Sequence, residues 1–159
     1  MIKIVKIKLI SQSEFIHNLY CESGEPDAPR KIWLNETSQA KDQIFKRHKE
    51  VARLLVSEKR ILGFFIFAKL KEGLNIGGAI VPEERGKGFG KRLFLLAAKM
   101  LEETYPGQKI FASTRTENIS AIKSLKKAGF IFLSKELKPP IDGVCGEIEY
   151  MNFIYKSKN

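Results

Sequence analysis

The chain has 159 residues, of which 43% are hydrophobic, so it is long enough to bury one self-sufficient core and we expect a single domain over residues 1–159. The formal net charge of +10 at pH 7 attracts acidic partners, and it is compatible with proteins that bind phosphate-containing ligands. With only two cysteines, two histidines and no long apolar run, the sequence disfavours a disulfide framework, a metal site and a membrane span, and we expect a cytoplasmic protein.

The first third of the chain predicts one strand and two helices. Apolar residues alternate with lysines, and Ser11 or Ser13 and then Thr37 or Ser38 are suitable helix caps. The predicted elements are a strand within residues 2–9, a short helix that ends near residue 20, a loop over residues 22–29 and a helix that ends near residue 49.

Three apolar segments joined by short turns follow in the middle of the chain. They span residues 51–56, 61–70 and 74–81, and they predict an antiparallel meander. Gly77 and Gly78 interrupt the third segment. Glycines inside a strand indicate a bulge or a close approach of another backbone.

A basic, glycine-rich loop, VPEERGKGFGKR at residues 81–92, leads from the third strand into a helix. Apolar residues recur three or four positions apart after it, at Phe89, Leu93, Leu96, Ala97 and Met100. The glycines therefore lie at a helix N-terminus, where unpaired amides and the helix dipole favour an anion. The loop predicts a phosphate-binding site, with a pyrophosphate as the natural ligand.

Spacing excludes two common phosphate-binding loops. In the P-loop pattern four residues separate the glycines and a Ser or Thr follows the lysine, but here only Lys87, Gly88 and Phe89 lie between Gly86 and Gly90, and Arg92 follows the lysine. The dinucleotide pattern needs a third glycine where Lys91 stands. The pattern that remains is R-x-x-G-x-G.

The last third of the chain predicts a strand, a helix and a closing pair of strands. The strands span residues 109–114, 130–134 and 148–155, with a loop at residues 139–143. Asn118 begins the helix and Gly129 ends it. With the earlier segments these elements complete a mixed sheet of about seven strands.

Two motifs resemble those of a known family. Arg85, Gly88 and Gly90, with a proline three residues before the arginine, resemble the acyl-CoA signature of the GNAT N-acetyltransferase superfamily. The segment at residues 118–130 is similar to that family's next motif, N-x-x-A-x-x-x-Y-x-K-x-G-F, with Leu125 in place of tyrosine. The resemblance implies an α/β (α+β) single-domain GNAT-like fold, in which a mixed, mostly antiparallel sheet of about seven strands is flanked by about four helices.

The resemblance also implies the reaction. An acetyl group would move from acetyl-CoA to a primary amine by direct attack in a ternary complex. In the family the bulged strand separates from its neighbour, so that pantetheine enters between the two strands. The residues that correspond to cofactor contacts are Gly78, Ala79, Ile80, Arg85, Gly86, Lys87, Gly88, Phe89, Gly90, Lys91, Asn118 and Ser124.

The catalytic groups are harder to assign. The strand that carries the family's usual carboxylate base has none here, which leaves Glu83, Glu147 and Glu149 as candidates through a water relay. Each is equally an ordinary surface carboxylate. Leu125 occupies the position of the tyrosine that commonly protonates the thiolate, and it cannot donate a proton.

Two other functions stay open. One is a CoA-binding regulatory module without turnover, because the usual tyrosine and base are missing. The other is a basic RNA-associated protein, or an acetyltransferase that acts on aminoacyl-tRNA, because basic residues cluster at residues 46–49, 59–60 and 123–127. We expect a monomer or a homodimer, and the sequence does not identify the acceptor amine.

Overall fold

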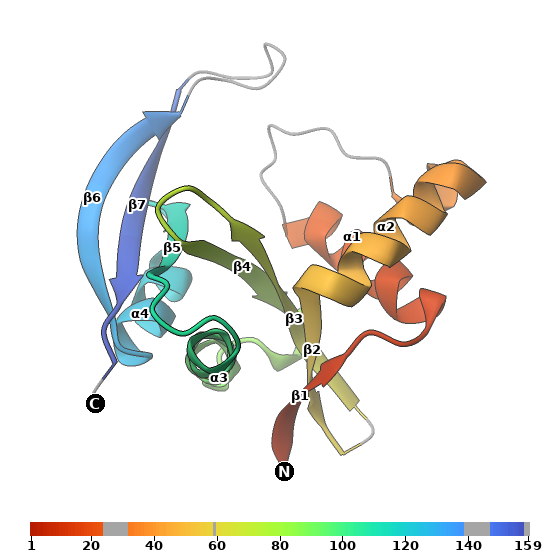
Figure 1. Ribbon diagram of the computed structural model, residues 1–159, viewed down its shortest axis with the longest axis horizontal. Helices are drawn as coiled ribbons and strands as arrows, with labels where there is room; N and C mark the ends of the chain where they lie inside the picture. Colours follow the sequence, from red (N-terminus) through yellow and green to blue (C-terminus); the bar gives the residue numbers. More distant parts are fainter. Residues whose placement is uncertain (24–31, 59, 139–146, 158–159) are drawn as a thin grey trace.

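The computed structural model describes residues 1–23, 32–58, 60–138 and 147–157, and its seven strands form one sheet in the order β1-β2-β3-β4-β5-β7-β6 (Figure 1). The strands are β1 (Ile2–Lys6), β2 (Ala52–Ser57), β3 (Arg60–Lys69), β4 (Leu74–Ile80), β5 (Ile110–Arg115), β6 (Phe130–Lys138) and β7 (Ile148–Tyr155). The helices are α1 (Ile10–Ser23), α2 (Ser38–Val51), α3 (Phe89–Thr104) and α4 (Ile119–Lys127), with short 3-10 turns η1 (Trp33–Asn35) and η2 (Pro82–Glu84).

The predicted fold class is confirmed. Every neighbouring pair of strands is antiparallel except β4 and β5, which are parallel. The predicted loop at residues 22–29 starts later than expected, because α1 continues to Ser23. The rest of that loop, and the loop at residues 139–143, lie outside the described residues.

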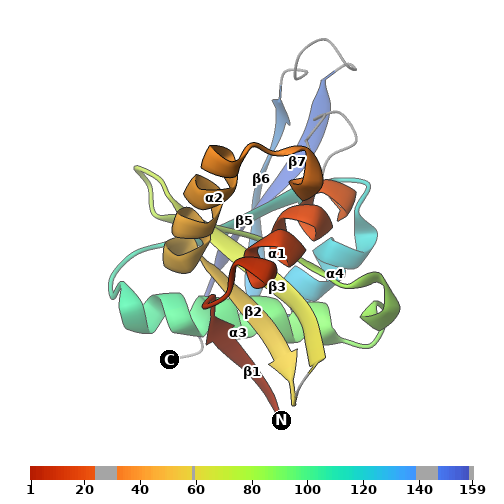
Figure 2. The same ribbon diagram turned by 90° about the vertical axis from the view of Figure 1, so that its right-hand side faces the viewer.

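The helices cover the two faces of the sheet. Helices α1 and α2 pack on one face and enclose a small core around Ile16, Leu54 and Phe64. Helices α3 and α4 pack on the other face, over a larger core that includes Phe65 and Leu93. Figure 2 shows α1 and α2 in front of β2 and β3, with α3 fainter behind them. The alternation along β3 explains the division, because Phe64 and Phe65 point to opposite faces.

The first helix is capped in a way that we did not expect. The side-chain oxygen of Gln12 accepts hydrogen bonds from the backbone N–H groups of Lys8, at 2.7 Å, and Leu9, at 2.9 Å. These contacts hold residues 8–9 ahead of α1, and β1 ends at Lys6. The predicted cap at Ser11 or Ser13 is therefore wrong. In α2, by contrast, the predicted Thr37 cap is confirmed, since its hydroxyl accepts from the N–H of Ala40 at 3.1 Å.

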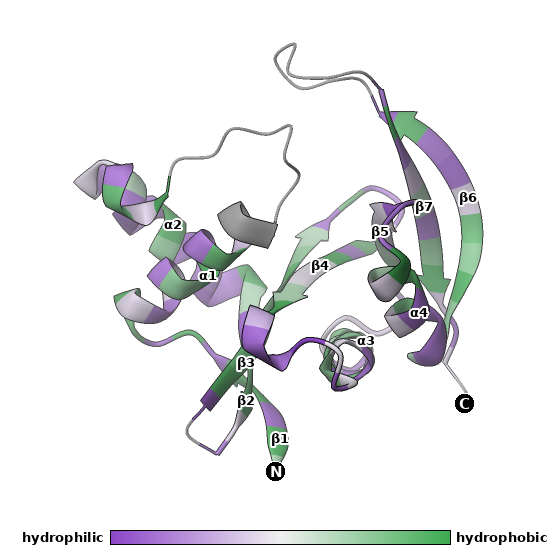
Figure 3. Cartoon of the chain, turned by 180° about the vertical axis from the view of Figure 1, so that it is seen from behind, coloured by the Kyte–Doolittle hydropathy of each residue, from purple (hydrophilic) through white to green (hydrophobic). Residues whose placement is uncertain are grey.

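The outermost strand is longer than predicted. β6 continues to Lys138 because its pairing with β7 runs from Phe130↔Tyr155 to Lys138↔Ile148, with one register shift between Phe132 and Ser134. It lies at the edge of the sheet, and all of its residues after Phe130 are exposed. Figure 3 shows the hydrophobic stretch on this strand, where Ile131, Phe132 and Leu133 are among the exposed large side chains.

Candidate active site

The parallel strands β4 and β5 separate in the middle of the sheet. Their pairing runs only from Leu74↔Ile110 to Ile76↔Ala112. Over the described residues no further pair joins them, although β4 continues to Ile80. The β5-facing edge of β4 therefore offers backbone N–H and C=O groups without a strand partner over roughly 13 Å, the length of four residues.

The glycines of β4 serve close packing. The β3–β4 ladder keeps one register from Lys69↔Leu74 to Gly63↔Ile80, so the predicted bulge at Gly77 and Gly78 is wrong for this ladder. A Cβ atom on Gly78 would overlap the carbonyl oxygen of Phe64 and lie 3.3 Å from a methyl group of Leu93. The alternative prediction, that a glycine in this strand allows a close approach of another backbone, is confirmed at Gly78, because β3 and α3 both lie against it.

The glycine-rich loop ends at the N-terminus of α3, as predicted. Gly88 is the N-cap and has φ 85°, a left-handed conformation that glycine adopts without strain. A Cβ atom on Gly88 would meet no described atom within 4 Å, so the space above it is open. The first-turn N–H groups of Phe89, Gly90 and Lys91 have no carbonyl partner inside the helix. The Nε of Arg85 donates to the carbonyl oxygen of Ile80 at 3.0 Å and ties the loop to β4.

A buried carboxylate that sequence reasoning missed supports the same loop. Glu84 is only 5% exposed, whereas the candidate base Glu83 beside it is exposed. Its two oxygens pair with Arg60 at 2.9 Å and with Lys87 at 3.0 Å. No spacing rule in the sequence distinguishes the buried Glu84 from the exposed Glu83. The difference arises in the structure, because the η2 turn directs Glu84 inward toward Arg60 at the start of β3.

Helix α4 places the second motif beside the loop. A Cβ atom on Gly90 would lie 2.7 Å from the Oγ of Ser124, so this hydroxyl lies against the first turn of α3. Asn118 is the N-cap of α4, and its side-chain oxygen accepts from the N–H of Ala121 at 3.1 Å. Leu125 is 1% exposed and belongs to the large core. The structure thus gives Asn118 and Leu125 structural contacts and puts Ser124 next to the loop.

A small pocket opens on the opposite face of the sheet, between α1, α2, β3 and β4. Its volume is about 290 Å³. The residues that line it are Ile16, His17, Tyr20, Ile44, Arg47, His48, Ile66, Ala68, Asn75 and Gly77. Since Asn75 and Gly77 flank the last residue of β4 that pairs with β5, this pocket reaches the sheet where the two strands separate.

One wall of this pocket, which we call the α1/α2 pocket, holds a buried histidine. His48 is 2% exposed, and its Nδ1 forms a 2.6 Å hydrogen bond with the hydroxyl of Ser13, which is fully buried. The pKa of His48 is lowered from 6.5 to about 4, mainly by burial and to a smaller extent by the neighbouring Arg47 and His17. His48 is therefore neutral at pH 7.

Polar side chains of the last three strands are already engaged. The hydroxyl of Ser113 on β5 donates to the side-chain oxygen of Asn152 at 2.6 Å, and the amide of Asn152 donates to Ser134 at 3.2 Å. Of the candidate bases near this edge, Glu147 is exposed and Glu149 pairs with Lys135 at 3.9 Å. Among the described residues that line the two pockets, none is a predicted catalytic carboxylate.

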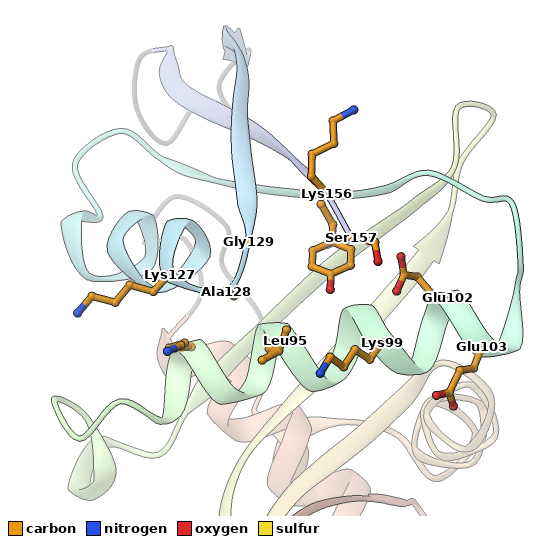
Figure 4. Close-up of a pocket in the computed structure, with 11 residues that line it drawn as sticks. Leu95, Lys99, Glu102, Glu103, Lys127, Ala128, Gly129, Lys156 and Ser157 are labelled. Atoms are coloured by element: carbon orange, nitrogen blue, oxygen red, sulfur yellow. The ribbon is translucent and has the colours of Figure 1, made fainter. Parts of the chain in front are cut away.

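A larger pocket of about 570 Å³ lies on the outer side of α3 (Figure 4). It begins at Lys91, in the first turn of that helix, and reaches the end of α4 and the end of β7. Tyr155 and Leu95 form apolar parts of its wall. Its charged lining residues are four lysines and two carboxylates, namely Lys91, Lys99, Lys127, Lys156, Glu102 and Glu103. Burial raises the pKa of Tyr155, and the nearby Glu102 carboxylate adds to this.

Two further properties concern the described residues only. No group of three or more His, Cys, Asp or Glu side chains is placed to hold a metal ion. Likewise, no helix in this part of the chain combines the length and the apolar character that crossing a membrane requires.

Comparison with solved structures shows the same fold in several proteins. A GNAT-family acetyltransferase from Bacillus anthracis has 15% identity and a TM-score of 0.73, covering 96% of this chain and 93% of its own. Ribosomal-protein-S5-alanine acetyltransferase from Vibrio fischeri has 19% identity and a TM-score of 0.71, covering 99% and 95%. A protein from Salmonella typhimurium, described with its cofactor acetyl-CoA, has 12% identity and a TM-score of 0.69, covering 98% and 95%.

Sequence comparison identifies the family. No curated protein sequence matches the chain significantly. The model of the acetyltransferase (GNAT) family, however, matches residues 14–130, which is more than half of the chain and includes both motifs. The match agrees with the separated strands and with the glycine loop at the start of α3. The chain therefore belongs to the GNAT family of acetyltransferases and is an acyltransferase.

Proposed function

We propose that this enzyme transfers the acetyl group of acetyl-CoA to the nitrogen of a primary amine, with both substrates bound together. The observation that carries the proposal is the continuity between two features. The glycine loop at the start of α3 lies directly after the part of β4 that has separated from β5. A phosphate site and an open strand edge therefore follow each other along one path.

The phosphate end of that path fits a pyrophosphate. Unpaired N–H groups at the α3 N-terminus point outward, Gly86 and Gly88 leave open space above the backbone, and Lys87 and Lys91 add positive charge. Buried Glu84 holds Lys87 at one side of this loop. The lysines around the pocket of Figure 4 extend the positive potential along α3.

The strand edge fits the rest of the cofactor. An extended chain with amide groups, such as pantetheine, can pair with the β5-facing backbone groups of β4 around Gly78, Ala79 and Ile80. The carbonyl of Ile80 already accepts from Arg85, which leaves the groups before it for the ligand. From the loop this path leads down β4 toward Ile76, where the strands rejoin. Acetyl-CoA supplies an activated thioester carbonyl, which would then lie at the junction next to the α1/α2 pocket.

The chain's own groups contribute mainly by positioning. The amine nitrogen attacks the carbonyl carbon, the C–N bond forms as the C–S bond breaks, and sulfur leaves as a thiolate. The proton of the amine passes to water. Ser113 does not accept it, because its hydroxyl is already hydrogen-bonded to Asn152. A CoA thiol titrates at roughly 8.5, so its thiolate leaves without an acid residue. The reaction therefore does not require a proton donor at the position of Leu125.

A direct assay tests the proposed function. Purified protein is incubated with radiolabelled acetyl-CoA and a panel of primary amines, and both free CoA and acetylated amine are measured. We expect release of CoA that depends on the amine and matches the acetylated product in amount. Binding of acetyl-CoA without turnover of any amine would instead support a regulatory module. RNA affinity that depends on salt and that acetyl-CoA leaves unchanged would support the RNA-associated alternative.

A further inference from the structure

We propose that the acceptor is a small amine that also carries an anionic group, and that Arg47 in the α1/α2 pocket binds that group. The proposal rests on the proposed function and names its second substrate. Arg47 lies on α2, far in sequence from both motifs, and it lines the pocket together with Asn75 and Gly77 of β4.

The position of the pocket makes it the entrance for the acceptor. The glycine loop and α3 occupy one face of the sheet, and the α1/α2 pocket lies on the other. The two faces communicate where β4 leaves β5, just beyond Ile76. An acceptor held against Gly77 would therefore meet a thioester that has come along β4 from the opposite side.

The size and lining of the pocket favour a small acceptor. Its volume of about 290 Å³ lies at the lower end of the range for ligand pockets. The apolar part of the wall comes from Ile16, Ile44, Ile66 and Ala68. Such a wall suits a short aliphatic or aromatic group, and a folded polypeptide surface would leave most of it unfilled.

The charge of the lining selects the polar group. Arg47 is the residue of permanent positive charge in this lining, and among the described lining residues none is Asp or Glu. Arg47 is exposed, and in the described part of the chain it forms no ion pair with a carboxylate. A guanidinium binds carboxylate or phosphate oxygens in a bidentate manner. Polyamines and basic peptides would instead need acidic residues at this position.

The contact with Arg47 acts by positioning, because the anionic group of the acceptor compensates the charge of the guanidinium. It holds a small acceptor in the pocket that reaches the point where β4 and β5 separate, and holding two reactants in line provides a large share of a rate enhancement. His48, neutral because it is buried, adds no positive charge to the pocket at pH 7.

The test uses pairs of acceptors that differ only in the anionic group. L-leucine is compared with isopentylamine, and 4-aminobutanoate and 3-aminopropylphosphonate are compared with n-butylamine. We expect kcat/KM to be at least roughly tenfold higher for the anionic member of the better pair, because a hydrogen bond to a charged group is worth about that factor or more. The carboxylate and phosphonate arms distinguish the two kinds of anion.

Two variants assign the effect to Arg47. Arg47→Met should raise KM for the anionic acceptor about tenfold and leave kcat/KM for the matched neutral amine nearly unchanged. Lys46→Met removes the same charge from the adjacent exposed position, outside the pocket lining, and should change neither acceptor. Equal losses with both acceptors in Arg47→Met would mean that Arg47 is only structural.

Other outcomes separate this inference from the proposed function. If spermidine or a peptide with an N-terminal alanine is acetylated and the anionic amines are not, the inference is overturned while the proposed function stands. If no amine of any class is acetylated although acetyl-CoA binds, both are overturned.

Discussion

The two faces of the sheet build their sites in different ways. On the α3 face, the glycine loop supplies backbone N–H groups and charges from one continuous segment, residues 82–91. On the α1/α2 face, the pocket combines side chains of four elements that are far apart in the sequence, from Ile16 to Gly77. A site made of consecutive backbone groups leaves a motif in the sequence, and a site made of converging side chains does not.

The difference extends to the buried polar groups that support each site. Glu84 holds the loop through two ion pairs, with Arg60 and Lys87. On the other face, Ser13 and His48 form one neutral hydrogen bond inside the core. The first support consists of ion pairs, whereas the second depends on His48 staying unprotonated. The two faces should therefore respond differently to pH and to substitution.

The largest expected effect is the acid sensitivity of the α1/α2 face. The folded-state pKa of His48 is about 4 and its ordinary value is 6.5, so between these values the unfolded chain binds the proton more readily. The free energy of unfolding should fall as pH drops through this window, by up to about 3 kcal/mol, and this contribution is fully present above pH 6.5. Urea unfolding at pH 7.5, 5.5 and 4.5 measures it.

The matched variants for this prediction are His48→Gln and His17→Gln. His48→Gln should flatten the pH dependence, whereas His17→Gln, which changes a less buried ring of the same pocket, should leave most of it. An unchanged slope in His48→Gln would contradict the assignment of the acid sensitivity to this residue.

The next effect concerns Leu125 in the core of the α3 face. Leu125→Tyr should lower the free energy of unfolding by about 2 kcal/mol, because the side chain is 1% exposed and a phenol would overpack its site. We expect no gain in kcat. Ile119→Tyr on the same helix is the control, since Ile119 is 55% exposed. Higher kcat with an unchanged melting temperature in Leu125→Tyr would show that position 125 does reach the thiol.

The glycine loop gives a loss of binding that exceeds the backbone strain of placing a side chain at a left-handed position. Gly88→Asp should weaken acetyl-CoA binding more than tenfold, above about 1.4 kcal/mol, since it adds bulk and negative charge against the phosphates. Gly107→Asp is the matched control, because Gly107 has nearly the same φ, 84°, and similarly open surroundings in the turn after α3. Titration calorimetry that finds equal affinity in both folded variants would remove the phosphate assignment.

The smallest effect is expected at Asn118. Its side chain caps α4, and serine caps almost as well, so Asn118→Ser should change the melting temperature and acetyl-CoA affinity very little. Asn118→Ala should cost about 1 kcal/mol of stability. A clear loss of acetyl-CoA affinity in Asn118→Ser at an unchanged melting temperature would return this residue to the cofactor site.

The sequence by itself determined most of the helices and strands and the position of the glycine-rich loop. Apolar spacing predicted the strands and helices because burial repeats every second residue in a strand and every three or four in a helix. The loop at residues 81–92 was predictable because closely spaced glycines and basic residues stand together in one short segment just before an apolar helical pattern. Its position at the start of α3 agrees with that prediction.

Only the tertiary structure decided which side chains meet. Gln12 caps α1 in place of a serine, Glu84 is buried beside an exposed Glu83, and β4 needs glycine for close packing without a bulge. Each outcome depends on partners distant in the sequence, such as Arg60 for Glu84. The α1/α2 pocket is the extreme case, because the packing of two helices on the sheet creates it. No short segment contains enough of its lining residues to form a recognisable pattern.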